Sequence, residues 1–118
     1  MTSTPSTIQF EPGAVVRVRI RFTAGQGAKR RPAVVLTDIP YHQSRSDAVV
    51  VALSSQLAST YHGDCDIVDW KSAGLPLPTK AKGVIETIDR ASVDYQYGML
   101  SSADLERVKD SLRLILGL

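Results

Sequence analysis

Apolar and charged residues alternate with a period of two over residues 16–22. The apolar set consists of Val16, Val18, Ile20 and Phe22, and the charged set of Arg17, Arg19 and Arg21. Because successive side chains of a β-strand point to opposite faces, the pattern predicts a strand with one apolar and one basic face. Side chains on one face repeat every ~6.8 Å, so the arginines form a row of positive charge. Two interpretations stay open: an exposed strand protected by charge and a nucleic-acid contact.

Two nearly continuous apolar runs predict buried strands at 32–37 and 48–53. The first run begins at Pro32, directly after three cations that end at Arg31. A proline is best tolerated at the first position of a strand, where its missing N–H costs least. We therefore expect Arg31 at the start of the strand, where the scaffold holds it in a position that can bind a phosphate. The second run ends at Ser54-Ser55-Gln56, whose hydroxyls suit either a turn or a phosphate site.

The rest of the chain carries turn signals and weaker strand signals. Two glycines predict a flexible loop at 23–29, and a proline followed by tyrosine and histidine predicts a second loop at 39–46. Two further strands are predicted at 63–70 and 83–89.

An amphipathic helix is predicted at the C-terminus. Its apolar stripe consists of Leu105, Val108, Leu112, Ile115 and Leu116. Ser101 and Ser102 offer an N-cap, and Gly117 offers a stop. Short strands separated by turn signals, followed by one helix, predict a mainly β fold: a small β-barrel with a C-terminal α-helix.

Length and composition favour a single globular domain. The chain has 118 residues, of which 43% are hydrophobic and 22% charged. We expect residues 1–10 to form a flexible tail and residues 11–118 to form one barrel domain. The single cysteine, Cys65, cannot form an internal disulfide, and no apolar run approaches the ~18 residues of a membrane span. These features favour a cytoplasmic protein that does not contact membranes.

Charge is distributed unevenly along the chain. Residues 1–45 contain seven Lys and Arg against two acidic residues, whereas residues 46–118 contain seven against ten. A basic first half indicates a polyanionic partner. A solvated strand face is the alternative explanation.

Several short motifs, taken in their order along the chain, resemble the MazF/PemK/Kid toxins of toxin–antitoxin pairs. The first motifs are Gly13…Val16-x-Val18 with Phe22, Arg31-Pro32-Ala33-Val34-Val35-Leu36 and Leu53-Ser54-Ser55-Gln56. Later motifs resemble the PemK branch: Gly63-Asp64…Asp69-Trp70-x-x-Ala73-Gly74-Leu75…Pro78, Thr87-Ile88-Asp89, and Gly98-x-Leu100-Ser101 with the helix to Leu116-Gly117-Leu118. The resemblance runs from about residue 11 to the end.

The resemblance implies a small SH3-like barrel of the CcdB/Kid type with a C-terminal α-helix, working as a homodimer. It implies a toxin of a type II toxin–antitoxin system: a sequence-selective, metal-independent endoribonuclease that cleaves single-stranded RNA, needs no cofactor and inhibits growth. The protein partner would be a cognate antitoxin whose flexible tail covers the RNA groove. The family's catalytic arginine matches Arg31, and its catalytic Ser/Thr matches Ser54.

The chemistry of these residue types agrees with that role. An RNA strand supplies its own nucleophile, the 2′-OH, so the enzyme must align it and stabilise the negative charge on the phosphate. The guanidinium of Arg31 can donate paired hydrogen bonds to phosphate oxygens, and Ser54 can add a neutral donor. Arg31 stays protonated near neutral pH and is a poor base. Further RNA contacts are expected from Arg17, Arg19, Arg21, Lys29, Arg30, Ser55 and Gln56.

The chain departs from the family pattern in three places. Many relatives carry a Glu in the loop before the Arg-Pro motif, but residues 23–28 contain no acid. Relatives often have Gly-Asp where this chain has Gly13-Ala14, and Arg where it has Glu86. Glu86, Asp38 or His42 could replace the missing base, although each also has a structural or solvent-facing explanation.

Other functions stay open at this stage. One is a barrel that binds RNA or protein without cutting, and another is a CcdB-like inhibitor of gyrase. A hydrolase built on Ser54 and a histidine lacks a nucleophile-elbow context. No metal site is expected, because Asp64 and Asp66 would point to the opposite strand face from Asp69.

Overall fold

The computed structural model describes residues 10–21, 27–58 and 60–118. Phe22, most of the glycine loop and the expected tail apart from Phe10 lie outside these described residues. Phe10 was assigned to the tail, but its side chain is buried against the apolar interior, so the packed domain already includes this residue. None of the helices in the described part of the chain has the length and apolarity needed to cross a membrane.

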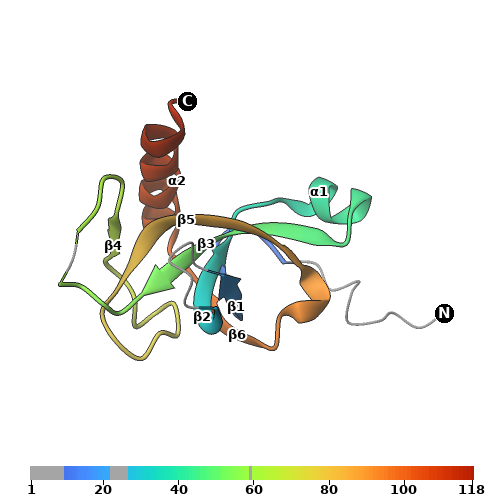
Figure 1. Cartoon of the computed structure of the whole chain (residues 1–118), viewed down its shortest axis with the longest axis horizontal. Coiled ribbons are helices and arrows are strands. Elements are labelled where there is room, and N and C mark those ends of the chain that lie inside the picture. Colours follow the sequence, from blue (N-terminus) through green and yellow to red (C-terminus); the bar gives the residue numbers. More distant parts are fainter. Residues whose placement is uncertain (1–9, 22–26, 59) are drawn as a thin grey trace.

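The fold is a strongly curved antiparallel sheet with a C-terminal helix, as the sequence predicts (Figure 1). Its six strands are ordered β4-β5-β3-β2-β1-β6. Helix α2 stands beside β4, and the short helix α1 lies by β3 at the opposite end of the molecule. The strands are β1 (Ala14–Arg21), β2 (Ala28–Val35), β3 (Asp47–Ser54), β4 (Cys65–Ile67), β5 (Thr79–Asp89) and β6 (Tyr95–Met99). The helices are α1 (Ile39–Ser44), a 3-10 turn η2 (Arg90–Ser92) and α2 (Ser102–Leu116).

The central strands are buried on both faces. One apolar cluster fills the inside of the curved sheet and includes Val16, Ala33 and Val50. A second cluster lies between the outside of the sheet and α2, and it includes Val34 and Val51. Neighbouring residues therefore enter different clusters, which explains why β2 and β3 read as continuous apolar runs.

The predicted loop at 39–46 is wrong, because it contains helix α1. The Asp38 carboxylate accepts a hydrogen bond from the backbone N–H of Ile39 at 2.7 Å and caps the helix. Pro40 lies in the first turn, where its missing N–H breaks no helical hydrogen bond. The proline that was interpreted as a loop signal is thus part of a helix start.

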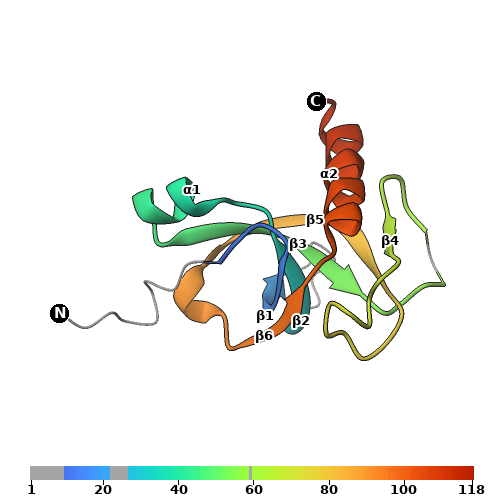
Figure 2. The same ribbon diagram turned by 180° about the vertical axis from the view of Figure 1, so that it is seen from behind.

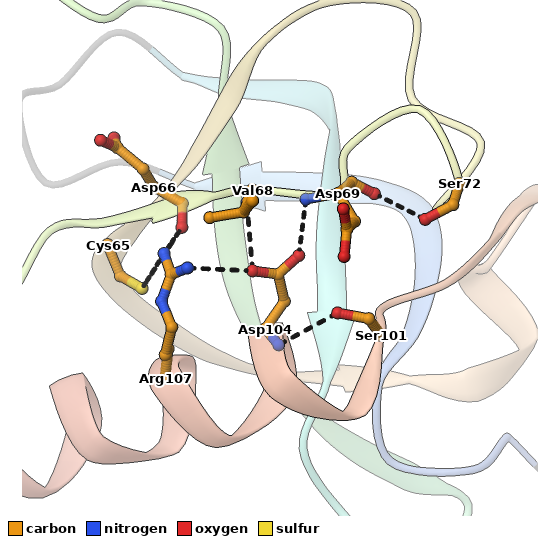
Figure 3. A network of polar contacts seen from close by, with 8 residues as sticks. All are labelled: Cys65, Asp66, Val68, Asp69, Ser72, Ser101, Asp104 and Arg107. Atoms are coloured by element: carbon orange, nitrogen blue, oxygen red, sulfur yellow. Dashed lines mark hydrogen bonds and ion pairs between the residues drawn. The ribbon is translucent and has the colours of Figure 1, made fainter.

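The predicted strand at 63–70 is shortened to β4. The buried carboxylate of Asp104, at the start of α2, accepts hydrogen bonds from the N–H groups of Val68 (3.1 Å) and Asp69 (2.9 Å), as Figure 3 shows. These groups are no longer available to a neighbouring strand, and the chain turns after Ile67.

Two other differences concern strand lengths and number. The strand predicted at 83–89 begins earlier, at Thr79. Strand β6 was not predicted. Its five residues alternate Tyr95, Tyr97 and Met99 with Gln96 and Gly98, but the run is short, and the strand forms by pairing with β1. The C-terminal helix is confirmed: Ser101 Oγ accepts from the N–H of Asp104 at 3.1 Å, and Gly117 ends the helix with a φ of 71°.

Candidate functional site

The register of β2 and β3 brings Arg31 and Ser54 to the same face of the sheet. The recorded pairs are Val35↔Val50, Val34↔Val51 and Ala33↔Ala52. Two residues beyond the last pair, Arg31 on β2 and Ser54 on β3 occupy matching positions. Both follow the alternation of Ala33 and Ala52, which lie in the inner cluster. The two residues matched to the family's catalytic pair thus lie on the same face of the sheet, just beyond the last pair between the two strands.

Pro32 explains why the strands separate at this point. It lies in the middle of β2 and not at its first position, so that prediction is wrong. Strand β2 keeps its pairing with β1 from Val34 to Ala28, whereas its pairing with β3 is recorded only up to Ala33. A proline cannot donate a hydrogen bond to a neighbouring strand. The β3 side of β2 is therefore left open beside Arg31.

Arg31 is half-buried and has a partly unsatisfied guanidinium. Its Nε is buried and has no hydrogen-bond partner among the described residues. An unsatisfied buried donor costs about 1–3 kcal/mol, and a catalytic role or a bound ligand is one of the explanations for such a group in a native protein. Ser54 is also half-buried, and its Oγ accepts a hydrogen bond from the N–H of Gln56 at 3.0 Å. Its hydroxyl hydrogen remains available as a donor.

A buried lysine extends this row of residues onto β5. Lys80 pairs in register with Ser54, and its Nζ lies 3.1 Å from Asp64 Oδ2, with both side chains only 3% exposed. Lys82 Nζ lies 3.6 Å from the same oxygen. Burial opposes ionisation of Asp64, but a hydrogen bond from the backbone of Tyr61 and the two ammonium groups outweigh it and lower the pKa of Asp64.

Lys80 was not predicted as a site residue. The predicted strand began at residue 83, after the proline-rich segment, so Lys80 was placed in a loop. The signal that was available is the alternation of Lys80, Lys82 and Val84, which continues the pattern of β5 in the N-terminal direction.

The predicted row of arginines lies on the other face of β1 and β2. Arg17, Arg19 and Arg21 alternate with the inner residues of β1, and Arg19 pairs with Arg30. Lys29, in contrast, pairs with Ile20 and follows the inner side, where it is exposed. The structure therefore brings Arg31, Ser54 and Lys29 to one side of the sheet and four arginines to the other.

The three residues considered as substitutes for the missing base have other contacts. His42 is buried and its Nε2 lies 2.6 Å from Thr37 Oγ1. Asp38 caps α1. The carboxylate of Glu86 accepts a hydrogen bond from the N–H of Arg21 at 3.0 Å. Within residues 10–21, 27–58 and 60–118, no hydrogen bond or ion pair joins a carboxylate or imidazole to Arg31 or Ser54.

The described residues contain no group of three or more His, Cys, Asp or Glu side chains that could hold a metal ion. Asp64 is engaged by Lys80 and Lys82 instead.

A protein-family model for "PemK-like, MazF-like toxin of type II toxin-antitoxin system" matches residues 11–116. The chain belongs to this toxin family. It is therefore the toxin of a type II toxin–antitoxin pair, and the family predicted from the motif order is confirmed. No match was found among curated protein sequences.

Solved structures of family members share the fold of this toxin. MazF from Deinococcus radiodurans superposes with a TM-score of 0.75 at 21% identity, covering 94% of this chain and 99% of that chain. An endoribonuclease from a mycobacterial species gives 0.74 at 18% identity, covering 94% of each chain. A mycobacterial endoribonuclease in complex with its cognate antitoxin gives 0.71 at 21% identity, covering 92% and 96%. These likenesses establish the fold over 92–94% of this chain.

Proposed function

We propose that this toxin is a sequence-selective, metal-independent endoribonuclease that cleaves single-stranded RNA and thereby inhibits growth. Similar structures come from endoribonucleases, one of them bound to its cognate antitoxin. The proposal includes a cognate antitoxin for this chain and a homodimeric working form. The observation that carries it is the placement of Arg31 opposite Ser54, at the point where β2 and β3 separate.

The proposed reaction uses the 2′-OH of the RNA as nucleophile. A bond forms between the 2′-oxygen and phosphorus while the bond from phosphorus to the 5′-oxygen breaks. One proton leaves the 2′-oxygen and one is delivered to the departing 5′-oxygen, so no metal or redox partner is needed. The products are a 2′,3′-cyclic phosphate and a free 5′-hydroxyl.

Arg31 is proposed to stabilise the charge that develops on the non-bridging phosphate oxygens. Its planar guanidinium offers several donors in a fixed arrangement, and its buried stem limits the rotation that binding would otherwise have to restrict. Ser54 adds a neutral donor on the neighbouring strand. Lys29, on the same side, and Ser55 and Gln56, directly after Ser54, are proposed to hold the adjacent phosphates.

A barrel that binds RNA without rapid cleavage is the second candidate. It is favoured by one observation: among the described residues, no carboxylate or imidazole that could accept the 2′-proton is hydrogen-bonded or ion-paired with Arg31 or Ser54. The two candidates share the same RNA site and differ only in turnover.

Cleavage of a long single-stranded RNA in EDTA tests the proposal directly. We expect discrete cuts by the wild-type protein, and loss of these cuts by about 10²-fold or more in Arg31→Ala, because one charge-stabilising donor typically contributes that much. Arg113→Ala serves as the matched control, because Arg113 is an exposed α2 residue paired with Asp110, and its cuts should be unchanged.

Other outcomes of this experiment separate the candidates. If the RNA stays intact but its mobility shifts in a gel, the protein binds RNA without cutting it, and the second candidate function is correct. Cuts that disappear on adding EDTA, or that persist at full rate in Arg31→Ala, would contradict a metal-independent site at Arg31.

A further inference from the structure

Four arginines gather on the outer side of β1 and β2. We refer to Arg17, Arg19, Arg21 and Arg30 as the outer arginine face. Arg19 and Arg30 are directly opposite each other across the two strands. Like charges at directly opposed positions, whose Cβ atoms lie about 4.5–5.5 Å apart, destabilise a sheet. The arrangement therefore costs stability, unless something compensates the charge.

Among the described residues, Asp94 partly compensates the positive charge of the outer arginine face. Asp94 accepts a hydrogen bond from Arg17 Nε at 3.0 Å and forms an ion pair with Arg30 Nη1. The hydrogen bond from Arg17 is the main cause of the lowered pKa of Asp94, and it raises the pKa of Arg17. The side chains of Arg19 and Arg21 make no hydrogen bond or ion pair with a described residue. Among the described residues, Asp94 is the one carboxylate that pairs with these four guanidinium groups, because the Glu86 carboxylate accepts from the backbone N–H of Arg21.

Aromatic side chains border this charge. The guanidinium of Arg17 lies over the ring of Tyr95, 5.3 Å from its centroid. Tyr95 packs edge-on against Tyr97, with 4.9 Å between ring centroids, and about half of Tyr95 is exposed. Arginines next to an exposed ring are typical of surfaces that bind single-stranded nucleic acid, because the rings stack on bases while the guanidinium groups bind phosphates.

The path of β2 connects this face to the proposed reaction site. Arg30 and Arg31 are consecutive and point to opposite sides of the strand. Along this part of β2 no pairing with β3 is recorded, so the strand has an open edge between the two sides. Figure 2 shows β1, β2 and β6 side by side, on the side of the molecule away from the C-terminal end of α2. A strand of RNA that leaves Arg31 across this edge meets Arg30 next.

We propose that the outer arginine face is a second contact for the same single-stranded RNA, which passes around the edge of β2 from the reaction site. The substrate of this toxin is then a long unstructured strand, and short oligonucleotides lack the second contact. The inference rests on the proposed function for the identity of the ligand. Binding by this face and cleavage at Arg31 are nevertheless separable measurements.

The test is equilibrium binding of fluorescent 2′-O-methyl RNA, which has no nucleophilic hydroxyl and cannot be cut. Oligonucleotides of about 8 and about 24 nucleotides are compared, since single-strand sites span roughly 4–16 nucleotides. Arg19→Gln removes a charge without breaking the ion pairs of Asp94 with Arg17 and Arg30. Arg19→Lys restores the charge, and Arg113→Gln is the control on α2.

We expect Arg19→Gln to weaken binding of the long RNA about 3- to 10-fold and to reduce the slope of log K against log salt by roughly 0.7. Binding of the short RNA should change less than twofold, Arg19→Lys should restore most of the affinity, and Arg113→Gln should resemble the wild type.

Three results would overturn the inference. One is unchanged binding of the long RNA by Arg19→Gln. Another is an equal loss of affinity for the short and the long RNA, which would mean that Arg19 acts only through the overall electrostatic field of the protein. The third is that Arg19→Gln loses binding to an acidic peptide such as oligoglutamate but keeps its binding to RNA. That result would make the outer arginine face a protein-docking surface. Absence of cleavage by the wild type, with the expected length dependence of binding, would refute the nuclease and leave the second contact in place.

Discussion

Burial changes what single polar side chains can do in this toxin. Arg31 keeps its guanidinium at the edge of the sheet while its Nε is shielded from water and unpaired. His42 is 2% exposed. One ring nitrogen, Nε2, is hydrogen-bonded to Thr37, and the other, Nδ1, has no hydrogen-bond partner among the described residues. The sequence identified Arg31 through its motif, placed His42 in a loop and offered it as one substitute for the missing base. Its burial follows from helix α1, which closes over the end of β3.

The buried His42 makes stability depend on pH. Burial, and next the charge of Arg90, lower the pKa of His42 below its ordinary value of 6.5, and together they outweigh the opposing effects of the Phe10 backbone and Asp38. The unfolded chain therefore takes up a proton at a higher pH than the folded chain. We expect the free energy of unfolding contributed by this group to be fully present above pH 6.5 and to be lost as the pH falls toward the lowered pKa.

Thermal unfolding of wild type and His42→Gln between pH 8 and pH 5 measures this effect. The wild-type midpoint should fall below about pH 6.5, and the variant should show a smaller fall over the same interval. Parallel curves for the two proteins would mean that His42 does not titrate differently on folding.

At the scale of elements, side-chain contacts decide where strands and helices stop. Asp104 joins the first turn of α2 to the chain after β4: its carboxylate binds Val68, Asp69 and the guanidinium of Arg107, whose other end reaches the carbonyl oxygen of Asp66 (Figure 3). The sequence showed Asp104 as a favourable charge in a first helical turn. Its partners lie 35 and 36 residues away, so local pattern could not reveal them.

Two isosteric substitutions in α2 separate the role of Asp104 as a link to the chain after β4 from an effect on helix propensity. Asp104→Asn should destabilise the protein by about 3 kcal/mol, because a buried network loses its charge and one acceptor. Asp110→Asn should change stability by less than about 0.5 kcal/mol, because Asp110 is 71% exposed and its pair with Arg113 is on the surface. Urea unfolding monitored by circular dichroism gives both values, and similar losses for the two variants would argue against a special role for Asp104.

At the scale of the whole molecule, the curvature of the sheet produces two chemically different sides. The inner side carries Arg31, Ser54 and Lys29 at its open edge, and the outer side carries the outer arginine face. The third exposed feature is the C-terminal end of α2. Three apolar side chains are exposed there: Leu114, Leu116 and Leu118. Exposed apolar groups of this kind mark protein–protein contacts when they are contiguous.

The proposed homodimer is expected to use this end of α2. Light scattering after size exclusion should give twice the 12.8 kDa of one chain, and the double substitution Leu114→Glu with Leu118→Glu should reduce the mass to that of a monomer. Leu77→Glu places the same charge on another exposed leucine, outside α2, and should leave the dimer intact. A monomeric wild type, or a dimer that survives the double substitution, would refute this interface.

The sequence by itself determined the strands β1 and β3, the apolar second half of β2, the helix α2 and the identity of Arg31 and Ser54 as a candidate pair, but it placed the start of β2 at Pro32 instead of Ala28. These features depend on local periodicity, capping residues and motif order, which are properties of neighbouring residues. Tertiary structure alone decided that β2 leaves β3 at Pro32, that Asp104 ends β4, that Lys80 lies buried beside Ser54 and that the arginines of β1 occupy the face opposite Arg31. The physical reason is that each of these outcomes depends on strand register or on a partner distant in sequence, and a pattern of single residues carries neither.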